Sequence, residues 1–352
     1  MAQNIFHNDY PWTLPDAPFV VSAPMMKITL GRLAVSVSAN GGFGFLAGGF
    51  DLNPLAKDLA EAADFAQSNN VPLHNGMLPI GVGVQNWGSD LQLALDALKA
   101  HPVAAVWFFA PKQLSDLLGW AKEIRAASDG KTKIWVQIGT VAEAIEVAKT
   151  TKPDVLVVQG SDSGGHGLSQ RASLMTLLPE VADTFAAEGI DIPLIAAGGI
   201  MDGRGVAAAL TLGAHGVALG TRFLACHEAV IARGYQEEVV RVTDGGVSTV
   251  ASTIYDVVRC IHGWPPTYVG RGVANRTFFD AVHGMSPAEN IELYKEATQQ
   301  GDAGWGPEGR MTTYAGTGIG LVKEVKSAGE IVKSIQVEAI QVLQKSATRY
   351  GK

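Results

Sequence analysis

One histidine stands inside a glycine-rich stretch of the sequence. Residues 155–170 read VLVVQGSDSGGHGLSQ, so four apolar residues are followed by four glycines that surround His166. An apolar run without alternation is typical of a strand that is buried on both faces. Glycines after such a strand let the backbone turn sharply and approach a ligand closely. Because an imidazole titrates near neutral pH, we predict that His166 is the catalytic residue of an active-site loop.

Two more glycine signals follow the last two predicted strands. The sequence AAGGI contains Gly198 and Gly199, and the sequence LGTR contains Gly220 and Thr221. In α/β barrels, the loops after the seventh and eighth strands commonly bind a phosphate through backbone N–H groups. We therefore predict a phosphate site at these four residues. Two ordinary tight turns are the alternative.

Other reactive residue types are scattered along the sequence. The only cysteines are Cys226 and Cys260, which fit free, buried thiols in a reducing compartment better than a disulfide framework. Cys226 is interpreted as a buried thiol rather than a nucleophile. No histidine, cysteine and carboxylate cluster has the spacing of metal ligands, so a metal site is not expected. Neither a GxSxG elbow nor a Walker motif is present.

Predicted strands and predicted helices alternate along the chain and must position these residues. Counting the segment after Gly220 as the last helix, there are eight strand–helix units. Eight buried strands, each followed by a helix, predict an α/β fold of the (β/α)8 TIM barrel type, with an open doubly wound sheet as the alternative. The predicted strands are 19–23, 43–47, 78–84, 103–109, 133–138, 155–158, 193–197 and 216–219. The predicted helices are 30–39, 53–68, 89–100, 111–128, 140–149, 172–188 and 203–212.

Beyond Cys226 the alternation ends. We predict that residues 1–226 and 320–352 form the barrel, and that residues 227–319 form a mainly helical substrate lid inserted after the eighth strand. Such an insertion lies at the carboxyl-end rim, where barrel active sites are found. The final helical segment is expected to return and pack on the barrel wall. The expected helical stretches are 228–240, 286–299 and 320–344.

Composition and charge exclude several classes of protein. The chain has 352 residues, of which 47% are hydrophobic and 17% charged, and its formal net charge is −7. These values are typical of a compact enzyme, and no block of Lys and Arg could follow the phosphates of a nucleic acid. The sequence shows neither a signal peptide nor a run of 18 apolar residues, so no membrane association is expected. We predict a cytosolic protein, with the mitochondrial matrix or the peroxisome as alternatives.

Taken together, the glycine loops resemble those of the nitronate monooxygenase family, also called 2-nitropropane dioxygenases. The matching segments are APM at 23–25, VVQGSDSGGHG at 157–167, and IAAGGIMDGRGVAAALTLGAHGVALGTRF at 195–223. The resemblance covers the barrel, from about residue 19 to residue 226, and is weak in the insertion. It implies an FMN-dependent TIM-barrel enzyme that uses O2 to convert nitronates or nitroalkanes to carbonyl compounds and nitrite.

The resemblance also implies a role for individual residues. The backbone of 23–25 would meet the isoalloxazine ring, the glycine loops would hold the FMN phosphate, and His166 matches the active-site histidine of the family. His166 would be the general base for neutral nitroalkanes, or a hydrogen-bonding cation for a nitronate that is already ionised. The implied FMN-binding residues are Ala23, Pro24, Met25, Gln137, Gln159, Gly160, Gly164, Gly165, Ala197, Gly198, Gly199, Gly220 and Thr221.

Three departures from the family pattern weaken any transfer of substrate preference. Asp162 and Ser163 replace a Glu-Ala pair that is frequent before the glycines. Gln137 is neutral where some relatives have a lysine, which removes a positive charge near the flavin. Gly83 stands where an asparagine is common.

Several readings of function stay open at this stage. The same barrel and loops serve FMN-dependent NAD(P)H enoyl-acyl-carrier-protein reductases and NAD(P)H:quinone reductases. A flavin-free barrel that isomerises a sugar phosphate and a non-catalytic flavin-binding protein are further alternatives. We expect a small-molecule substrate and O2 as partners, no nucleic acid, and a monomer or homodimer.

Two further features of the sequence allow two interpretations each. Residues 314–318 (YAGTG) form either a helix-entry loop that Thr317 caps, which we favour, or a flap that lines the substrate pocket. Trp87, Trp264 and Trp305 could wall that pocket or belong to the core.

Overall fold

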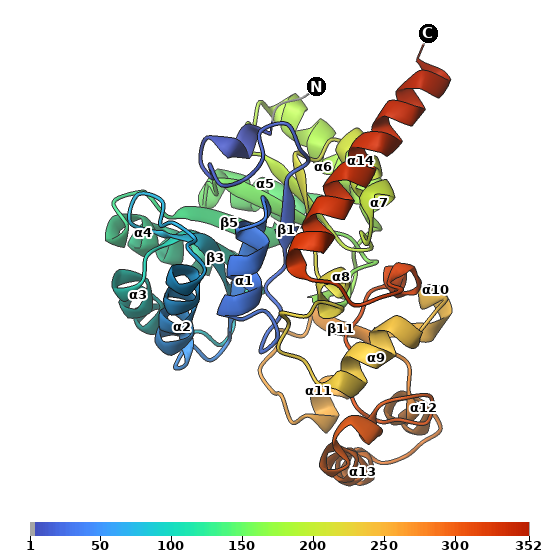
Figure 1. Cartoon of the computed structure of the whole chain (residues 1–352). Helices are drawn as coiled ribbons and strands as arrows, with labels where there is room; N and C mark the ends of the chain where they lie inside the picture. Colours follow the sequence, from blue (N-terminus) through green and yellow to red (C-terminus); the bar gives the residue numbers. More distant parts are fainter. Residues whose placement is uncertain (1–3, 352) are drawn as a thin grey trace.

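A computed structural model describes residues 4–351 of the chain, so only residues 1–3 and 352 of the predicted barrel segments lie outside it. Eight parallel strands close into a barrel in the order β1-β2-β3-β4-β5-β6-β8-β9 (Figure 1). This confirms the prediction of an α/β TIM barrel. The barrel strands are β1 (Val20–Ser22), β2 (Phe43–Gly49), β3 (Leu78–Gln85), β4 (Val103–Phe109), β5 (Lys133–Ile138), β6 (Val155–Gln159), β8 (Leu194–Ala197) and β9 (Gly216–Leu219).

A ring of helices covers the outside of the barrel. Side chains at several helix starts accept hydrogen bonds from N–H groups of the first turn, which explains why the helices begin there: Asp90 does so for α3, Thr140 for α5 and Asp202 for α7. The helices that follow the first seven barrel strands are α1 (Gly31–Ser38), α2 (Leu55–Ser68), α3 (Leu91–Ala100), α4 (Asp116–Ala127), α5 (Val141–Thr150), α6 (Leu174–Glu188) and α7 (Gly203–Thr211).

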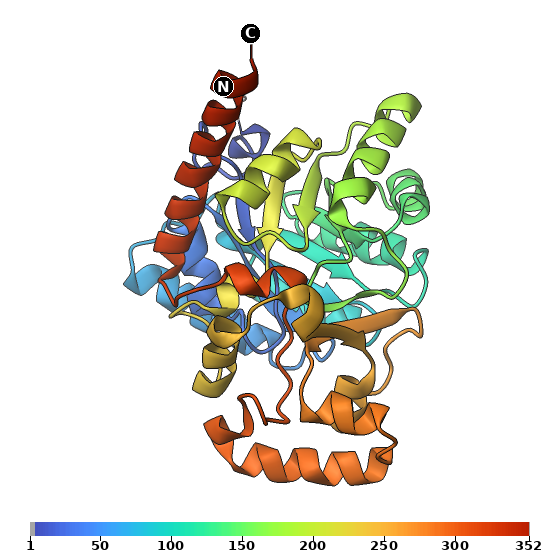
Figure 2. The ribbon, with the colours of Figure 1, turned by 90° about the vertical axis from the view of Figure 1, so that its right-hand side faces the viewer.

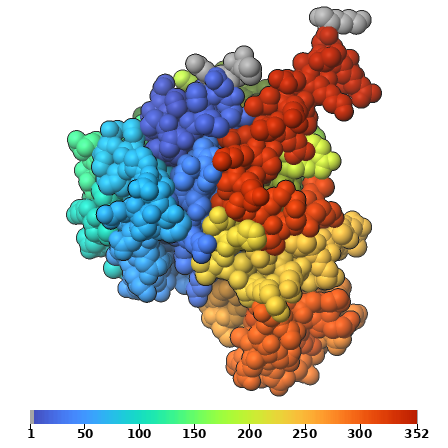
Figure 3. Space-filling model, viewed as in Figure 1, coloured from blue at the N-terminus to red at the C-terminus, as the bar shows by residue number. Residues whose placement is uncertain are grey.

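The eighth helix of the ring is not the segment after Gly220, so that prediction was wrong. Only a four-residue helix, α8 (Thr221–Leu224), follows β9. The eighth position is filled by the last helix, α14 (Ala328–Tyr350), which packs against both α7 and α1. Its return to the barrel wall was predicted, but it begins at Ala328 because Ser327 and Glu330 form a capping box there. Its last turns extend beyond the barrel (Figures 1 and 3).

Between α8 and α14 the chain makes an excursion over one end of the barrel (Figure 2). The excursion contains helices at both predicted stretches, although the first begins later than expected, at Arg233. It also contains two strands that the sequence analysis did not predict. The elements are α9 (Arg233–Arg241), α10 (Gly245–Ser248), β10 (Thr249–Ser252), α11 (Ile254–Val258), β11 (Tyr268–Val273), α12 (Arg276–Val282), α13 (Pro287–Gln299), η2 (Gly301–Gly304) and η3 (Thr317–Leu321).

The excursion is joined to the barrel by a second sheet, of order β10-β11-β7. Strand β7 (Gly165–Leu168) comes from the glycine-rich stretch after β6 and runs antiparallel to β11. We expected this stretch to be an irregular loop. It becomes a strand because β11, about 100 residues later in the sequence, supplies the hydrogen-bonding partner that the local sequence lacks.

The opposite end of the barrel is closed by the N-terminal segment. A 3-10 helix, η1 (Ile5–His7), leads into aromatic side chains that fill the barrel interior together with residues of the strands. Tyr10 is buried among these rings, and its hydroxyl accepts a hydrogen bond of 3.0 Å from Nε1 of Trp135. This aromatic floor, formed by Phe6, Tyr10, Phe19, Phe43, Phe45, Trp107 and Trp135, leaves only the other end of the barrel open to a ligand.

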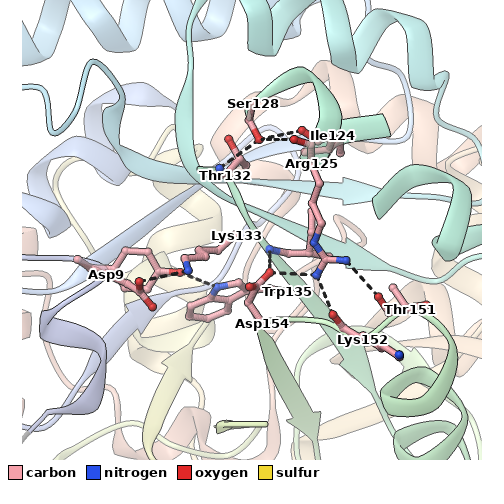
Figure 4. Close-up of polar contacts among 12 residues, drawn as sticks. Asp9, Ile124, Arg125, Ser128, Thr132, Lys133, Trp135, Thr151, Lys152 and Asp154 are labelled. Carbon is pink, nitrogen blue, oxygen red and sulfur yellow. Dashed lines mark hydrogen bonds and ion pairs between the residues drawn. The ribbon is translucent and has the colours of Figure 1, made fainter. Parts of the chain in front are cut away.

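Polar contacts tie the same end of the barrel together (Figure 4). Arg125 of α4 donates hydrogen bonds to the carbonyl groups of Thr151 and Lys152 and to the carboxylate of Asp154. Asp154 also accepts from the N–H group of Ile134, at the start of β5. These bonds fix α4, β5 and β6 relative to one another. Among residues 4–351, no helix is both long and apolar enough to cross a membrane.

Candidate active site

A cavity of about 570 Å³ lies between the carboxyl ends of the barrel strands and the excursion. One wall belongs to the barrel and combines glycine backbone with apolar side chains and the amide side chains of three glutamines. The other belongs to the excursion and is rich in aromatic rings. The barrel wall includes Ala23, Pro24, Met25, Gly83, Gln85, Gln137, Gln159, Gly164, Gly165, Gly220 and Thr221. The excursion contributes Tyr235, Arg259, Trp264, Tyr294, Trp305, Met311 and Tyr314.

His166 lines this cavity from strand β7. It lies opposite Gly270 of β11, where a Cβ atom would be only 3.3 Å from the imidazole and 2.8 Å from the ring of Tyr314. The absence of a side chain at Gly270 thus leaves room for both rings. Nε2 of His166 is 2.8 Å from Oδ2 of Asp256, a residue of α11. Their side chains are only 10% and 11% exposed, so this pair is shielded from bulk water.

A tryptophan covers one face of the imidazole. The rings of His166 and Trp264 are parallel within 3°, with centroids 3.9 Å apart. Trp264 is in turn supported by Trp87, at 5.3 Å. Gly263, whose φ is +106°, positions this segment, because a Cβ there would meet the ring of Trp87 at 2.6 Å. Of the three tryptophans considered from the sequence, Trp264 and Trp305 line the cavity, and Trp87 is buried behind Trp264.

Asp256 joins His166 to a tyrosine. Its Oδ1 accepts a hydrogen bond of 3.0 Å from the hydroxyl of Tyr314. Burial, and then the negative charge of Asp256, raise the pKa of Tyr314 well above its ordinary value, so Tyr314 stays protonated and donates. When the neutral imidazole donates its Nε2–H to the same carboxylate, the lone pair is on Nδ1. The carboxylate also stabilises the imidazolium, so the arrangement suits a histidine that takes up a proton.

Residues 314–318 form part of this site and do not cap the last helix. The N–H group of Gly316 donates to Oγ1 of Thr221, and Oγ1 of Thr317 donates to Oδ1 of Asp162. Thr317 begins η3, whereas Ser327 caps α14. Our favoured reading of this segment was therefore wrong. The segment packs on residues 162–164 and contributes Tyr314 to the cavity.

The structure brings nine of the thirteen predicted cofactor residues to the cavity wall: Ala23, Pro24, Met25, Gln137, Gln159, Gly164, Gly165, Gly220 and Thr221. Gly83, noted as a departure from the family, packs directly under Pro24, and a Cβ there would be 2.3 Å from the proline ring. Gln137 accepts a hydrogen bond from Nε1 of Trp107. Gln159 donates to the carbonyl of His166 and so links β6 to β7.

The other four predicted residues lie one layer behind the wall. Gly160 and Ala197 pair at the ends of β6 and β8. Gly198 and Gly199 have φ angles of +107° and +76°, a region that favours glycine. A Cβ at Gly198 would be 3.0 Å from the carbonyl oxygen of Gly160, and the Gly199 position packs against Asp162. Gly198 and Gly199 thus pack against the 160–164 segment, and none of the four residues lines the cavity.

The side chain of Arg171 forms hydrogen bonds with the 160–164 segment. Arg171 donates from Nε to the carbonyl of Gly160, from one terminal nitrogen to the carbonyl of Leu168, and from the other to Oγ of Ser163. Burial, and then the charge of Arg271, lower the pKa of Arg171 to about 10. Its hydrogen bonds hold both sides of the chain around His166.

Sequence reasoning raised Trp264, Trp305 and Tyr314 as possible pocket residues, but it missed two charged residues of the excursion. Asp256 and Arg259 belong to no motif, and 90 positions separate Asp256 from His166. Only the pairing of β7 with β11 brings this part of the chain to the histidine, and no spacing in the sequence signals that pairing. Nothing at Asp256 distinguishes it from the other acidic residues of the excursion.

The remaining candidates lie outside the cavity wall. Cys226 and Cys260 are both free thiols, but Cys260 is exposed, so the expectation that both are buried was wrong. Cys226 is buried, and its thiol donates to Glu228. Burial, the largest effect, raises the pKa of Cys226, as does this hydrogen bond, so a reactive thiolate is disfavoured.

Within residues 4–351, no three His, Cys, Asp or Glu side chains gather closely enough to hold a metal ion.

Comparisons with known proteins point to a single family. A family profile described as Nitronate monooxygenase matches residues 118–338. Nitronate monooxygenase npaC of Metarhizium robertsii is 46% identical over 338 residues, which cover 95% of this chain and 93% of that protein. A nitronate monooxygenase of Neurospora crassa is 36% identical over 351 residues, which cover 93% and 90%.

Solved structures show the same fold. FabK from Thermotoga maritima superposes with a TM-score of 0.73 and 22% sequence identity, covering 99% of both chains. At this level of identity the similarity shows the fold and does not extend to the reaction.

Proposed function

Because the chain belongs to the nitronate monooxygenase family, we propose that it oxidises nitronates with O2 to carbonyl compounds and nitrite, using FMN. The observation that carries this proposal is His166, which lies in the wall of a mainly apolar cavity at the carboxyl end of a TIM barrel and is paired with the carboxylate of Asp256. A proton acceptor supported by a carboxylate is what the removal of an acidic C–H proton requires.

The residues of the barrel wall fit a flavin. Pro24, packed on Gly83, presents an apolar side chain to the cavity, and Oε1 of Gln85 is buried at the cavity without a hydrogen-bond partner among the described residues. At Gly165 and Gly220 a ligand could approach the backbone, since a Cβ would meet nothing closer than 3.8 Å. We propose that Pro24, Gln85 and Gln137 bind the ring, and that the N–H groups near Gly165, Gly220 and Thr221 bind the phosphate.

FMN, when bound, accepts electrons from the nitronate and passes them to O2. The residues of this chain then have three tasks. His166 takes the proton from the α-carbon of a neutral nitroalkane, and the Asp256 carboxylate stabilises the resulting imidazolium. Towards a nitronate that arrives as an anion, the same imidazolium is a hydrogen-bond donor. We further propose that residues 227–319 are the substrate lid, whose ring at Trp264 shields the imidazole from water.

Anaerobic mixing with two substrates tests the proposal. The protein reconstituted with FMN is mixed with ethyl nitronate or with neutral nitroethane, and the loss of flavin absorbance near 450 nm is followed. We expect both to reduce the flavin in the wild type. In His166→Ala, we expect nitroethane reduction to fall by about 10²–10⁴-fold, the usual contribution of a general base. Reduction by the nitronate should fall less, because the proton is already gone.

The matched control is His283→Ala, which removes an exposed histidine outside the cavity wall. This variant should behave as the wild type. Equal rates for His166→Ala and the wild type with both substrates would remove His166 from the mechanism. A protein that stays colourless after incubation with FMN would contradict the flavin itself and favour a flavin-free barrel.

A further inference from the structure

The cavity opens to solvent between two segments of the chain. Among the described residues that line it, three are exposed: Lys27, Val230 and Ala232. Lys27 belongs to the turn that follows β1, and the other two belong to the segment before α9. A hydrogen bond of 3.0 Å from the N–H group of Val230 to the carbonyl of Ile28 joins the two segments. We call this opening, formed by residues 26–28 and 230–232, the cavity mouth.

Lys27 has a backbone conformation that disfavours a side chain. It is the third residue of a turn in which the N–H group of Ile28 donates to the carbonyl of Met25, at 2.9 Å. Its φ is +64°, a value that at this position of a β-turn favours glycine or asparagine. The buried hydroxyl of Thr29 donates to the carbonyl of Ala23 and holds the turn in place. A lysine that is kept under backbone strain beside a cavity points to a function of its side chain.

The charge of Lys27 is not paired within the protein. Among the described residues, no carboxylate forms an ion pair with its ammonium group. Hydrogen bonds that Asp51 accepts lower the pKa of this exposed carboxyl most, and the charge of Lys27 adds only the smallest effect. At the other edge of the mouth, Arg233 pairs with Glu237 and Asp302, at 3.3 and 3.6 Å. The field of Lys27 can therefore act on a ligand.

A positive charge at this place affects anions and neutral molecules differently. The protein carries a formal net charge of −7, so it repels anions at long range, whereas a neutral nitroalkane feels no such force. A cation at the entrance of a cleft raises the local concentration of anions and the rate at which they enter. The other side chains of the rim, Ile28, Val230 and Ala232, are apolar and carry no charge that opposes this attraction.

We propose that the cavity mouth is the entrance for the substrate and that Lys27 steers nitronate anions into it. Lys27 acts on entry, before the reaction, so it is a steering residue and not a catalytic one. This inference rests on the proposed function, because it takes a nitronate anion as the substrate. The attraction of the mouth for anions can nevertheless be measured without the reaction.

The variants change the charge and respect the backbone conformation. Lys27→Asn removes the charge and suits a positive φ, so its melting temperature should be at or above that of the wild type, whereas Lys27→Arg keeps the charge. The matched control is Lys152→Asn. Lys152 is also exposed and has a φ of +49°, but it precedes β6 at the other end of the barrel and lies outside the cavity wall.

The kinetic test compares ethyl nitronate with neutral nitroethane at two ionic strengths. At about 0.01 M, where the screening length is about 30 Å, we expect kcat/KM of Lys27→Asn for ethyl nitronate to fall on the order of 2- to 5-fold, mainly through KM. The value for nitroethane should not change. At about 1 M, where the screening length is about 3 Å, the wild type and Lys27→Asn should agree with both substrates. Lys27→Arg and Lys152→Asn should behave as the wild type throughout.

A second measurement needs no turnover. Iodide, which is an anion, and acrylamide, which is neutral, both quench the fluorescence of FMN bound in the cavity. At low ionic strength we expect the iodide quenching constant of Lys27→Asn to be on the order of 2- to 5-fold below that of the wild type. The acrylamide constant should be the same in both proteins.

Each contrary outcome has a distinct meaning. Equal losses with both substrates, an identical salt dependence in the wild type and Lys27→Asn, or an unchanged iodide constant would overturn the steering role. A lower flavin content of Lys27→Asn, seen as a lower ratio of absorbance at 450 nm to 280 nm, would show that Lys27 holds the cofactor and would also overturn it. A wild-type protein that oxidises neither substrate, but whose iodide quenching depends on Lys27, would instead contradict the proposed function and leave the steering role standing.

Discussion

At the scale of single residues, the site depends on contacts between distant parts of the chain. His166 could be identified from its surroundings in the sequence, because glycines on both sides of one histidine are a recognisable pattern. Its partner Asp256 could not. The histidine of the candidate site was thus signalled by local sequence, whereas its contact with a carboxylate partner depends on the tertiary fold.

Replacing Asp256 by asparagine tests this pairing. The amide has nearly the same shape but no negative charge, so the imidazolium loses its counter-charge. A charge-assisted hydrogen bond contributes about 1.5–3 kcal/mol, which corresponds to a fall of about 10- to 100-fold in kcat with nitroethane. We expect a smaller loss with ethyl nitronate, which needs no deprotonation. Stopped-flow flavin reduction measures both rates.

A control separates charge from folding. Asp64→Asn changes an exposed carboxylate on α2 and should leave both rates unchanged. The melting temperature and flavin content of Asp256→Asn should stay near those of the wild type. If Asp256→Asn slowed both substrates equally, the carboxylate would be acting on something other than proton transfer.

At the scale of elements, the barrel could be predicted almost completely and the excursion could not. Each of the first seven barrel strands is a short apolar run followed by a helix of the outer ring, and this signal lies within about 30 residues. The sheet of β7, β10 and β11 is formed by segments far apart in the sequence, and Gly165–Leu168 has too few β-branched residues to be recognised as a strand. Likewise, nothing near Gly220 shows that the eighth helix comes from the end of the chain.

The closing helix α14 is the element whose removal we expect to be most damaging to the barrel. Its buried residues end at Ala339, and within it Nε2 of Gln336 donates to the carbonyl groups of Pro18 and Gly41. Gln336→Ala leaves these buried groups without donors. We expect a loss of about 1–3 kcal/mol in the free energy of unfolding, measured by urea denaturation.

Truncation provides the matched comparison. Ending the chain after Leu343 removes turns whose described residues are all exposed and which extend beyond the barrel in Figure 3. This shortened protein should unfold within about 0.5 kcal/mol of the full chain. A large loss on truncation together with a neutral Gln336→Ala would show that the protruding turns, and not the packed half, stabilise the barrel.

At the scale of the whole molecule, buried tyrosines determine how stability responds to alkaline pH. Burial is the largest cause that raises the pKa of five tyrosines above the ordinary value near 10. These residues are Tyr10, Tyr235, Tyr255, Tyr268 and Tyr314. Above pH 10 the unfolded chain releases these protons while the folded protein keeps them. Ionisation therefore stabilises the unfolded state relative to the folded one.

We therefore expect the free energy of unfolding to be independent of these groups below about pH 9 and to fall as the pH rises past 10. Each tyrosine contributes a slope of about 1.4 kcal/mol per pH unit once the unfolded form is ionised. Urea unfolding between pH 8 and pH 11 measures the slope. Tyr268→Phe should reduce it by about one group, whereas Tyr350→Phe, at a side chain that is 75% exposed, should not. A slope that is identical in all three proteins would contradict this account.

The excursion over the barrel begins and ends at the same place. Cys226 and Lys326 form a parallel bridge, the N–H group of Lys326 donates to the carbonyl of Ala225, and that of His227 donates to the carbonyl of Lys326. About 100 residues thus leave the barrel and return to it at a single junction. Because α14 follows this junction, the ring of helices can be completed only after nearly the whole chain has been synthesised.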